Sequence, residues 1–270
     1  MADIRGKINT LYSLEQLAAG DTAVHRVAPL PKLAVTLVYL VCVLSLDRYA
    51  LARLAPYLFY PVIVSALAEV PAGMLLRRAA VALPFCLFAG LGNLLLDRAP
   101  LFYLGGLPVS GGAVALLTLL ARALLCAGAV LLLAAVTPFA RLTETLRYLR
   151  VPELLVTLLE MVYRYLGILA GEAADMLTAF RLRAGGARWP RVREFGPFVG
   201  QLLLRSADRA ERVYRAMQCR GYHLRARTHK RRGRAWRVGD LCFLLLGAGS
   251  AVLFRLLDVT ALLGGVAAWR

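Results

Sequence analysis

Two segments of the sequence end in an arginine that is followed closely by a glycine. The first reads Ala179-Phe-Arg-Leu-Arg183-Ala-Gly, and the second reads Ala216-Met-Gln-Cys-Arg220-Gly-Tyr. Each comes after apolar residues at helical spacing, so each arginine is expected at the carboxyl end of a helix. A guanidinium group there is favoured by the helix dipole and offers a rigid fork of donors to carboxylates. Two similar helix ends would suit two copies of one partner subunit.

A simpler interpretation of the two arginines stands beside this one. Basic residues are common at helix ends, where they bond to the last carbonyl groups. Arg183 and Arg220 would then only cap their helices or contact lipid phosphates. The residues alone leave both interpretations open.

The helix before the first arginine is expected over Val151–Arg183. Pro152 suits its first turn. Gly167 and Gly171 form a small-xxx-small step that would let another helix approach closely. The helix is amphipathic, with an apolar band (Leu154, Leu155, Leu158, Leu159, Val162, Leu166, Leu169) opposite a polar stripe (Glu153, Thr157, Glu160, Arg164).

A second amphipathic helix is expected from about Phe198 to Arg220, ending at Gly221. Its apolar residues, among them Leu203 and Tyr214, keep helical spacing. Oppositely charged residues one turn apart on a helix can pair. The pairs expected in the two helices are Glu160–Arg164, Asp208–Arg212 and Glu211–Arg215.

The composition places these helices in a membrane protein. Of 270 residues, 60% are hydrophobic and 18% are charged, and the mean hydropathy is +0.64. Average soluble domains are less apolar and more charged, and disordered chains are poor in apolar residues. The net charge of +17 would suggest nucleic acid in a soluble protein. Long uncharged apolar runs argue instead for a membrane protein with its positive charge on the cytoplasmic side.

We expect an all-α polytopic protein with about five transmembrane helices and long amphipathic cytoplasmic helices. A span needs about 20 residues. The chain divides into 1–136 (amino-terminal segment and four spans), 137–237 (cytoplasmic helices) and 238–270 (last span and tail). The expected spans, with a cytoplasmic turn at Arg77-Arg78, are Leu33–Leu46, Tyr49–Val70, Ala79–Leu96, Val109–Val136 and Val238–Leu257.

The distribution of charge sets the expected orientation. Residues 137–237 hold 21 Lys and Arg against 8 Asp and Glu, a net charge of +13. Because positively charged loops stay in the cytoplasm, this region and the amino terminus are expected on the cytoplasmic side of the cell membrane. The loops at Asp47-Arg48 and Asp97–Pro108 then face outward.

The two arginine segments resemble the paired Ala-Arg-Gly signatures of the transmembrane T component of energy-coupling factor (ECF) transporters. The stretch from Gly20 to Leu33, Gly-Asp-Thr-Ala-Val-His-Arg-Val-Ala-Pro-Leu-Pro-Lys-Leu, is similar to the entry segment of the cobalt-type CbiQ branch. The first signature departs from the pattern, with Leu182-Arg183-Ala184 in place of Ala-Arg-Gly. Its functional arginine is therefore Arg183 or Arg181, and the spacing favours Arg183.

The resemblance implies a scaffold without a cofactor of its own. It would couple two ABC ATPase subunits (CbiO-like), which bind ATP and Mg, to a substrate-binding membrane subunit (CbiM-like, with or without a small CbiN-like subunit). The solute would be cobalt, with nickel close behind and a vitamin as an alternative. The implied ATPase-coupling residues are Arg183, Arg220, Ala216, Gly221 and Arg181. Those implied to pack against the substrate-binding subunit are Gly167, Gly171, Leu158, Val162, Leu203 and Tyr214.

Other functions find less support in the residues. The chain lacks a G-x-x-x-x-G-K-[ST] run, so we do not expect it to hydrolyse ATP. Its three histidines (His25, His223, His229) have no acidic or Cys partner at ligand spacing, and no metal site is expected. A membrane-embedded lipid-modifying enzyme would need clustered His, Asp or Glu residues, and a self-sufficient permease would need internal repeats.

Two basic features remain. Arg122 lies within a long apolar run, where it is either a functional group or a residue facing the bundle interior. The basic cluster over 225–237 is expected to contact anionic lipid headgroups, because no aromatic platform for RNA is interleaved with it.

Overall fold

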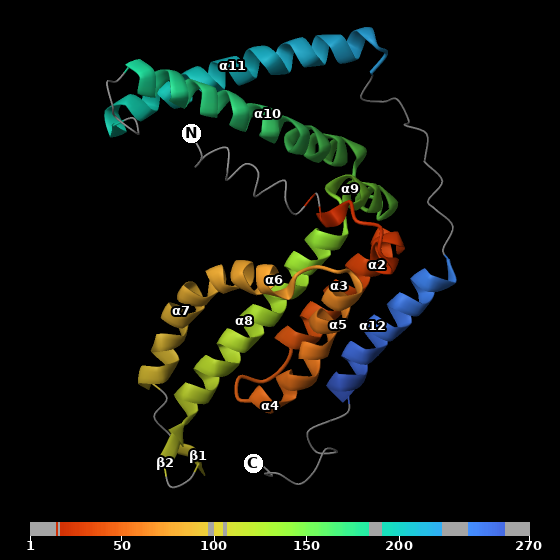
Figure 1. Ribbon diagram of the computed structural model, residues 1–270, viewed down its shortest axis with the longest axis vertical. Helices are drawn as coiled ribbons and strands as arrows, with labels where there is room; N and C mark the ends of the chain where they lie inside the picture. The colour runs from red at the N-terminus through yellow and green to blue at the C-terminus, as the bar shows by residue number, and fades with distance from the viewer. Residues whose placement is uncertain are drawn as a thin grey trace. The chain divides into compact units, whose positions relative to one another are not determined.

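A computed structural model describes residues 15, 17–96, 100–104, 107–183, 191–222 and 237–256. The chain is all-α, as predicted, apart from one short hairpin among the described residues (Figure 1). In this hairpin β1 (Pro100–Leu104) pairs antiparallel with β2 (Leu107–Ser110), where the sequence analysis expected only a loop. The described residues form two compact units, one of residues 15–142 and 237–256 and the other of residues 143–183 and 191–222.

The first unit, the membrane bundle, is built around its longest helix, α8. Helix α8 packs against α3 to α7, and α12 packs against α3 (Figure 1). Gly247 allows the second contact, because a Cβ atom at this position would lie 2.6 Å from Val35. The helices of the bundle are α2 (Ala23–Arg26), α3 (Pro29–Leu44), α4 (Leu51–Leu54), η1 (Ala55–Leu58), α5 (Phe59–Leu67), α6 (Ala72–Ala79), η2 (Ala80–Ala82), α7 (Leu83–Leu96), α8 (Gly111–Val136) and α12 (Val238–Leu256).

Buried tyrosines join three of these helices in the bundle core. Tyr39 of α3 donates a hydrogen bond to the Tyr57 carbonyl at 3.0 Å, and the Tyr57 hydroxyl donates to the Ala251 carbonyl of α12 at 3.2 Å. The Tyr39 ring also stacks on Tyr60, with 4.7 Å between the ring centroids. Each buried hydroxyl thus has a backbone partner, as an apolar interior requires.

The turn expected at Arg77-Arg78 is wrong, because both arginines lie in the last turn of α6. The chain turns earlier, at Glu69, whose φ is 55°. The amide of Val70 donates to the Ser65 carbonyl at 3.0 Å and closes the end of α5. Pro71 follows, and proline disfavours a helical conformation in the residue before it. Local backbone geometry, rather than the pair of positive charges, decides where α5 ends and α6 begins.

Four helical stretches are long and apolar enough to cross a membrane: Ala72–Gly92, Gly111–Val136, Glu153–Arg183 and Val238–Leu256. Gly111–Val136 and Val238–Leu256 coincide with expected spans, whereas Ala72–Gly92 only overlaps the expected span Ala79–Leu96. The first two expected spans correspond to shorter apolar helices, Pro29–Leu44 and Leu51–Leu67. Together these helices make the chain a multi-pass membrane protein. The remaining long stretch, Glu153–Arg183, is the helix that the sequence analysis expects on the cytoplasmic side of the membrane.

The second unit contains two long helices, α10 (Glu153–Arg183) and α11 (Val192–Cys219). They lie side by side and antiparallel (Figure 1), and an ion pair between Glu172 and Arg209 joins them. Helix α9 (Phe139–Tyr148) begins in the bundle and continues into this unit.

The predicted start of α11 at Phe198 is wrong, because the helix begins six residues earlier. The Glu194 carboxylate accepts a hydrogen bond from the Arg191 amide at 2.9 Å, and the Glu194 amide donates to the Arg191 carbonyl at 2.8 Å. These contacts satisfy backbone groups that a helix start leaves unpaired. Pro197 consequently lies inside the helix.

Candidate functional site

The carboxyl end of α11 forms a Schellman motif around Gly221. The amide of Gly221 donates to the Gln218 carbonyl at 2.9 Å, and the amide of Tyr222 donates to the Met217 carbonyl at 3.0 Å. Both bonds require the left-handed conformation at Gly221, whose φ is +80°, and glycine adopts it without a steric cost. The turn expected at this glycine is therefore present.

This turn sets the position of Arg220. Arg220 is the C-cap of α11, and its amide donates to the Ala216 carbonyl at 3.3 Å. Its side chain is exposed. Because the chain reverses at the next residue, the guanidinium group stands at the tip of a 28-residue helix.

The other candidate arginines lie in the last turn of α10. Arg183 is the final residue of the helix and is exposed, whereas Arg181 is half-buried. Exposure therefore favours Arg183 as the residue that a partner would reach. The turn expected at Ala184-Gly185-Gly186 lies outside the described residues.

The two arginines stand at opposite ends of the helix pair. Since α10 and α11 run antiparallel (Figure 1), the end of α10 lies beside the beginning of α11. The 28 residues of α11 span about 42 Å. Arg183 and Arg220 thus lie far enough apart to contact two separate copies of a partner.

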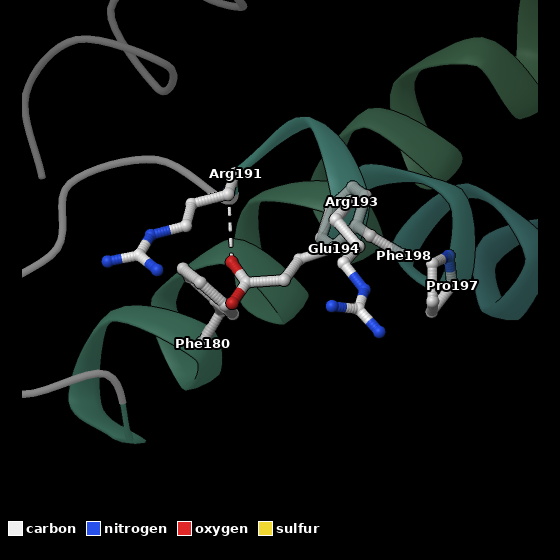
Figure 2. Close-up of a pocket in the computed structure, with 6 residues that line it drawn as sticks. All are labelled: Phe180, Arg191, Arg193, Glu194, Pro197 and Phe198. Carbon is white, nitrogen blue, oxygen red and sulfur yellow. Dashed lines mark hydrogen bonds between the residues drawn. The ribbon is translucent and has the colours of Figure 1, made fainter.

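An open depression of about 660 Å³ adjoins the end of α10 (Figure 2). The Arg191 and Arg193 side chains lie on either side of Glu194, and neither forms an ion pair with a described residue. Guanidinium groups beside an apolar surface suit carboxylates on a partner. Sequence reasoning missed both arginines, although the spacing Arg-x-Arg after Pro190 was a visible signal. The lining residues are Phe180, Arg191, Arg193, Glu194, Pro197 and Phe198.

The apolar faces of α10 and α11 are uncovered within this chain. Leu158 and Val162 are 51% and 63% exposed, and Leu203 and Tyr214 are 66% and 48% exposed. A Cβ atom built on Gly171 would have no neighbour within 4 Å. The close helix approach predicted at Gly167 and Gly171 is therefore not made at Gly171 by a described residue, and the prediction stays open for a partner.

The polar face of α10 contacts α9. The Glu160 carboxylate accepts hydrogen bonds from the Thr143 hydroxyl at 2.9 Å and from the Arg147 guanidinium at 2.8 Å. Glu160 thus pairs with Arg147 rather than with Arg164, and that predicted pair is wrong. The pair Glu211–Arg215 is confirmed, whereas Asp208–Arg212 is absent from the ion pairs of the described residues.

A buried polar cluster lies where α3, α8, α9 and α12 meet in the bundle. Lys32 is 2% exposed, and its ammonium group donates to the Val136 carbonyl at 2.9 Å. Arg141 of α9 donates to the His25 carbonyl at 3.2 Å. Lys32 lies in the first turn of α3.

In the same cluster, the Asp240 carboxylate accepts hydrogen bonds at the starts of two helices. This residue is 2% exposed. One oxygen accepts from the Ala28 amide at 2.7 Å, before α3, and the other accepts from the Arg237 amide at 2.8 Å, before α12. An acidic group is favoured at a helix amino terminus, and here one carboxylate ties together residues 212 positions apart.

The described residues show no arrangement that would hold a metal ion. No group of three or more His, Cys, Asp or Glu side chains is close enough for this among them. The His25 ring is buried and bonded to the Thr22 hydroxyl at 2.7 Å and to the Leu17 carbonyl at 3.0 Å. His223 and His229, and the basic cluster over 225–237 apart from Arg237, lie outside the described residues.

Comparison with known proteins adds a family to this geometry. The family model described as CbiQ, cobalt transport protein, matches residues 20–230. A cobalt transport protein CbiQ of Rhodobacter capsulatus is 41% identical over 93 residues, which cover 33% of this chain and 37% of the relative. An uncharacterized protein of Methanocaldococcus jannaschii is 26% identical over 152 residues, or 54% of this chain and 50% of the relative.

A further relative carries two components in one chain. A putative fused cobalt transport protein CbiMQ of Methanocorpusculum labreanum is 28% identical over 87 residues, which cover 32% of this chain and 14% of the relative. The matches thus cover half or less of each of these curated relatives.

Proposed function

Because the chain belongs to the CbiQ family of cobalt transport proteins, we propose that it is the transmembrane T component of an ECF-type importer. In this role it transmits movement from two cytoplasmic CbiO-like ATPases to a separate substrate-binding membrane subunit. The proposed solute is cobalt, as the family and the printed names of two relatives suggest. ATP and Mg bind to the ATPases, and this chain holds no cofactor and catalyses no reaction.

The observation that supports this role most strongly is the pair of exposed arginines at opposite ends of α10 and α11. Each guanidinium group can dock in a carboxylate-bearing groove of one ATPase. When the two ATPases move relative to each other, the two docked ends must move with them. The rigid helices then carry this displacement to whatever covers their apolar faces.

We assign those apolar faces to a CbiM-like substrate-binding subunit, with or without a CbiN-like subunit. The relative whose printed name joins CbiM and CbiQ in one chain is consistent with such a pairing. The exposed side chains of Leu158, Val162, Leu203 and Tyr214 supply the apolar area that a membrane partner would bury.

We place α10 and α11 on the cytoplasmic side of the cell membrane, with the amino terminus on the same side. The net charge of +13 over residues 137–237 supports this orientation. Although α10 is long enough to cross a bilayer, it carries seven charged residues along its length. A surface position leaves these charges in water while the leucines face the membrane. The basic residues that follow α11 contact anionic lipids rather than nucleic acid.

The test is cobalt uptake by cells that carry Arg220→Glu. This variant should insert normally and lose ATP-driven uptake, because an acidic tip repels the carboxylates that the arginine would bind. Arg205→Glu is the matched control, since it makes the same charge change at an exposed position of the same helix. Normal uptake with Arg220→Glu would overturn the coupling role.

A second measurement tests whether the carboxyl ends of α10 and α11 each bind an ATPase. The double variant Arg183→Glu with Arg220→Glu should lose both ATPases on purification in detergent. The same double variant with Arg181→Glu in place of Arg183→Glu should lose only the ATPase bound at α11. Continued co-purification of both ATPases with the first double variant would contradict the proposal that each helix end binds one ATPase.

A further inference from the structure

Two arginines from distant parts of the chain meet at the end of the membrane bundle where α3 stops. Arg122 of α8 donates to the carbonyls of Leu46 at 2.6 Å and Asp47 at 3.2 Å. Arg255, in the last turn of α12, donates to the Ser45 carbonyl at 3.3 Å. The three carbonyl groups belong to consecutive residues, so both guanidinium groups converge on one short stretch of backbone.

These two positive charges have no acidic partner within the part of the chain that the structure describes. Neither arginine forms an ion pair there, and neither does the exposed carboxylate of Asp47. Arg122 and Arg255 each donate through Nη2 alone, although a guanidinium group offers further N–H donors. The Nε atom of Arg122 is buried without a hydrogen-bond partner among the described residues. Backbone carbonyls thus compensate the two charges only in part.

The arginine pair lies at the depth where the apolar part of the bundle ends. Helices α3 and α12 pack together. Asp240 bonds to the amides that precede both helices, and the bond from Arg255 to Ser45 joins their carboxyl ends. With 16 and 19 residues, the helices are about 24 Å and about 28 Å long. The apolar core of a bilayer is about 30 Å thick and thins around a shorter protein. The pair is therefore at the depth of lipid phosphates.

The surface next to the pair suits a lipid molecule. Leu44 and Leu256, which adjoin Ser45 and Arg255 in sequence, are 59% and 77% exposed. Apolar area for acyl chains thus lies beside the charges. On the same loop, the Arg48 guanidinium lies 5.7 Å from the ring centroid of Tyr49. Tyrosine is typical of the membrane interface, and Arg48 adds a third positive charge.

We propose that Arg122 and Arg255 bind the phosphate group of one anionic phospholipid, whose acyl chains lie against the neighbouring leucines. The unused N–H donors of the two guanidinium groups donate to the phosphate oxygens, because arginine matches phosphate geometry. The phosphate charge completes the compensation that the carbonyl groups begin. Arg48 favours a headgroup with net negative charge over a zwitterionic one. This site goes beyond the proposed coupling role and uses no residue of α10 or α11.

Native mass spectrometry of the full chain in detergent tests this site. The wild type should retain one molecule of phosphatidylglycerol and bind phosphatidylcholine more weakly. Arg255→Gln should weaken phosphatidylglycerol binding about tenfold or more, the ordinary effect of losing a hydrogen bond from a charged group. The glutamine amide can still donate to the Ser45 carbonyl, so the end of α12 should keep its place.

The matched control is Arg77→Gln. Arg77 is exposed in the last turn of α6, within the same bundle, and makes no contact with the carbonyls of residues 45–47. This variant makes the same charge change and should leave phosphatidylglycerol binding unchanged. Arg122→Gln should weaken binding at least as much as Arg255→Gln. Where Arg122→Gln fails to insert, Arg255→Gln alone decides, because Arg255 is exposed and its replacement leaves the bundle core intact.

The lipid site is overturned when Arg255→Gln binds phosphatidylglycerol as tightly as the wild type does. It is also overturned when the wild type binds both lipids equally, or when Arg77→Gln weakens binding to the same extent, which would reflect net charge alone. Inorganic phosphate is the last arm of the test. Displacement of the lipid by phosphate at an equal concentration would show that a free ion is bound instead. None of these outcomes affects the proposed function, which fails when Arg220→Glu retains normal uptake.

Discussion

Replacing Gly221 by alanine should lower the stability of α11, whereas replacing Gly200 by alanine should raise it. Both glycines belong to the same helix or its end, and a Cβ atom at either position would meet nothing within 4 Å. Steric crowding therefore plays no part, and only the backbone conformation differs. Gly221 has a φ of +80°, whereas Gly200 lies inside the helix.

The magnitudes follow from these conformations. A left-handed backbone costs a non-glycine residue about 1–2 kcal/mol, and the smaller entropy of alanine in the unfolded chain offsets about 0.5–1 kcal/mol of this. Gly221→Ala should therefore weaken the last turn by about 1 kcal/mol. Alanine in a helix interior is favoured over glycine by about 1 kcal/mol, so Gly200→Ala should strengthen α11 by about that amount. The two variants should differ by about 2 kcal/mol, or roughly thirtyfold in an opening equilibrium.

Hydrogen exchange of purified protein, followed by mass spectrometry, measures both effects. In Gly221→Ala, the segment containing the Tyr222 amide should exchange about fivefold faster, because its bond to the Met217 carbonyl opens more often. In Gly200→Ala, exchange in the middle of α11 should slow. ATPase retention should fall in the first variant, because Arg220 is presented by that turn. Faster exchange in both variants, or unchanged exchange in Gly221→Ala, would refute the reasoning.

The buried polar cluster gives a further prediction at Asp240. Asp240→Ala should lower the free energy of unfolding by about 3 kcal/mol, because two amides lose a charged acceptor. Asp240→Asn should lose about half as much, since one oxygen remains, and a fully stable Asp240→Ala would contradict the double cap.

The elements that the sequence predicts well are those with local causes. The carboxyl ends of α10 and α11 follow from helical spacing, and the turn at Gly221 follows from glycine alone. The start of α11 was missed because Arg191 is not a typical capping residue. The capping contacts of Glu194 outweigh this signal.

The polar contacts depend on tertiary structure, and the sequence did not reveal them. An i,i+4 rule considers one helix at a time, so it assigned Glu160 to Arg164 on α10. In the folded chain Thr143 and Arg147 of α9 offer the same carboxylate two donors. Likewise, nothing in the local sequence around Asp240 indicates the Ala28 amide 212 residues earlier. Such partners are decided by which helix ends the fold brings together.

The interpretation of Arg122 as a residue facing the bundle interior depends on the carboxyl end of α3, which the fold brings close to it. Helix α3 has 16 residues and is therefore about 24 Å long, shorter than the apolar core of a bilayer at about 30 Å. Both of its ends must find polar partners, since hydrocarbon offers none. Asp240 accepts from the Ala28 amide at one end, while Arg122 and Arg255 donate to the carbonyls of residues 45–47 at the other. Arg122 at membrane depth is thus explained as a cation that binds backbone carbonyls at the carboxyl end of a short helix.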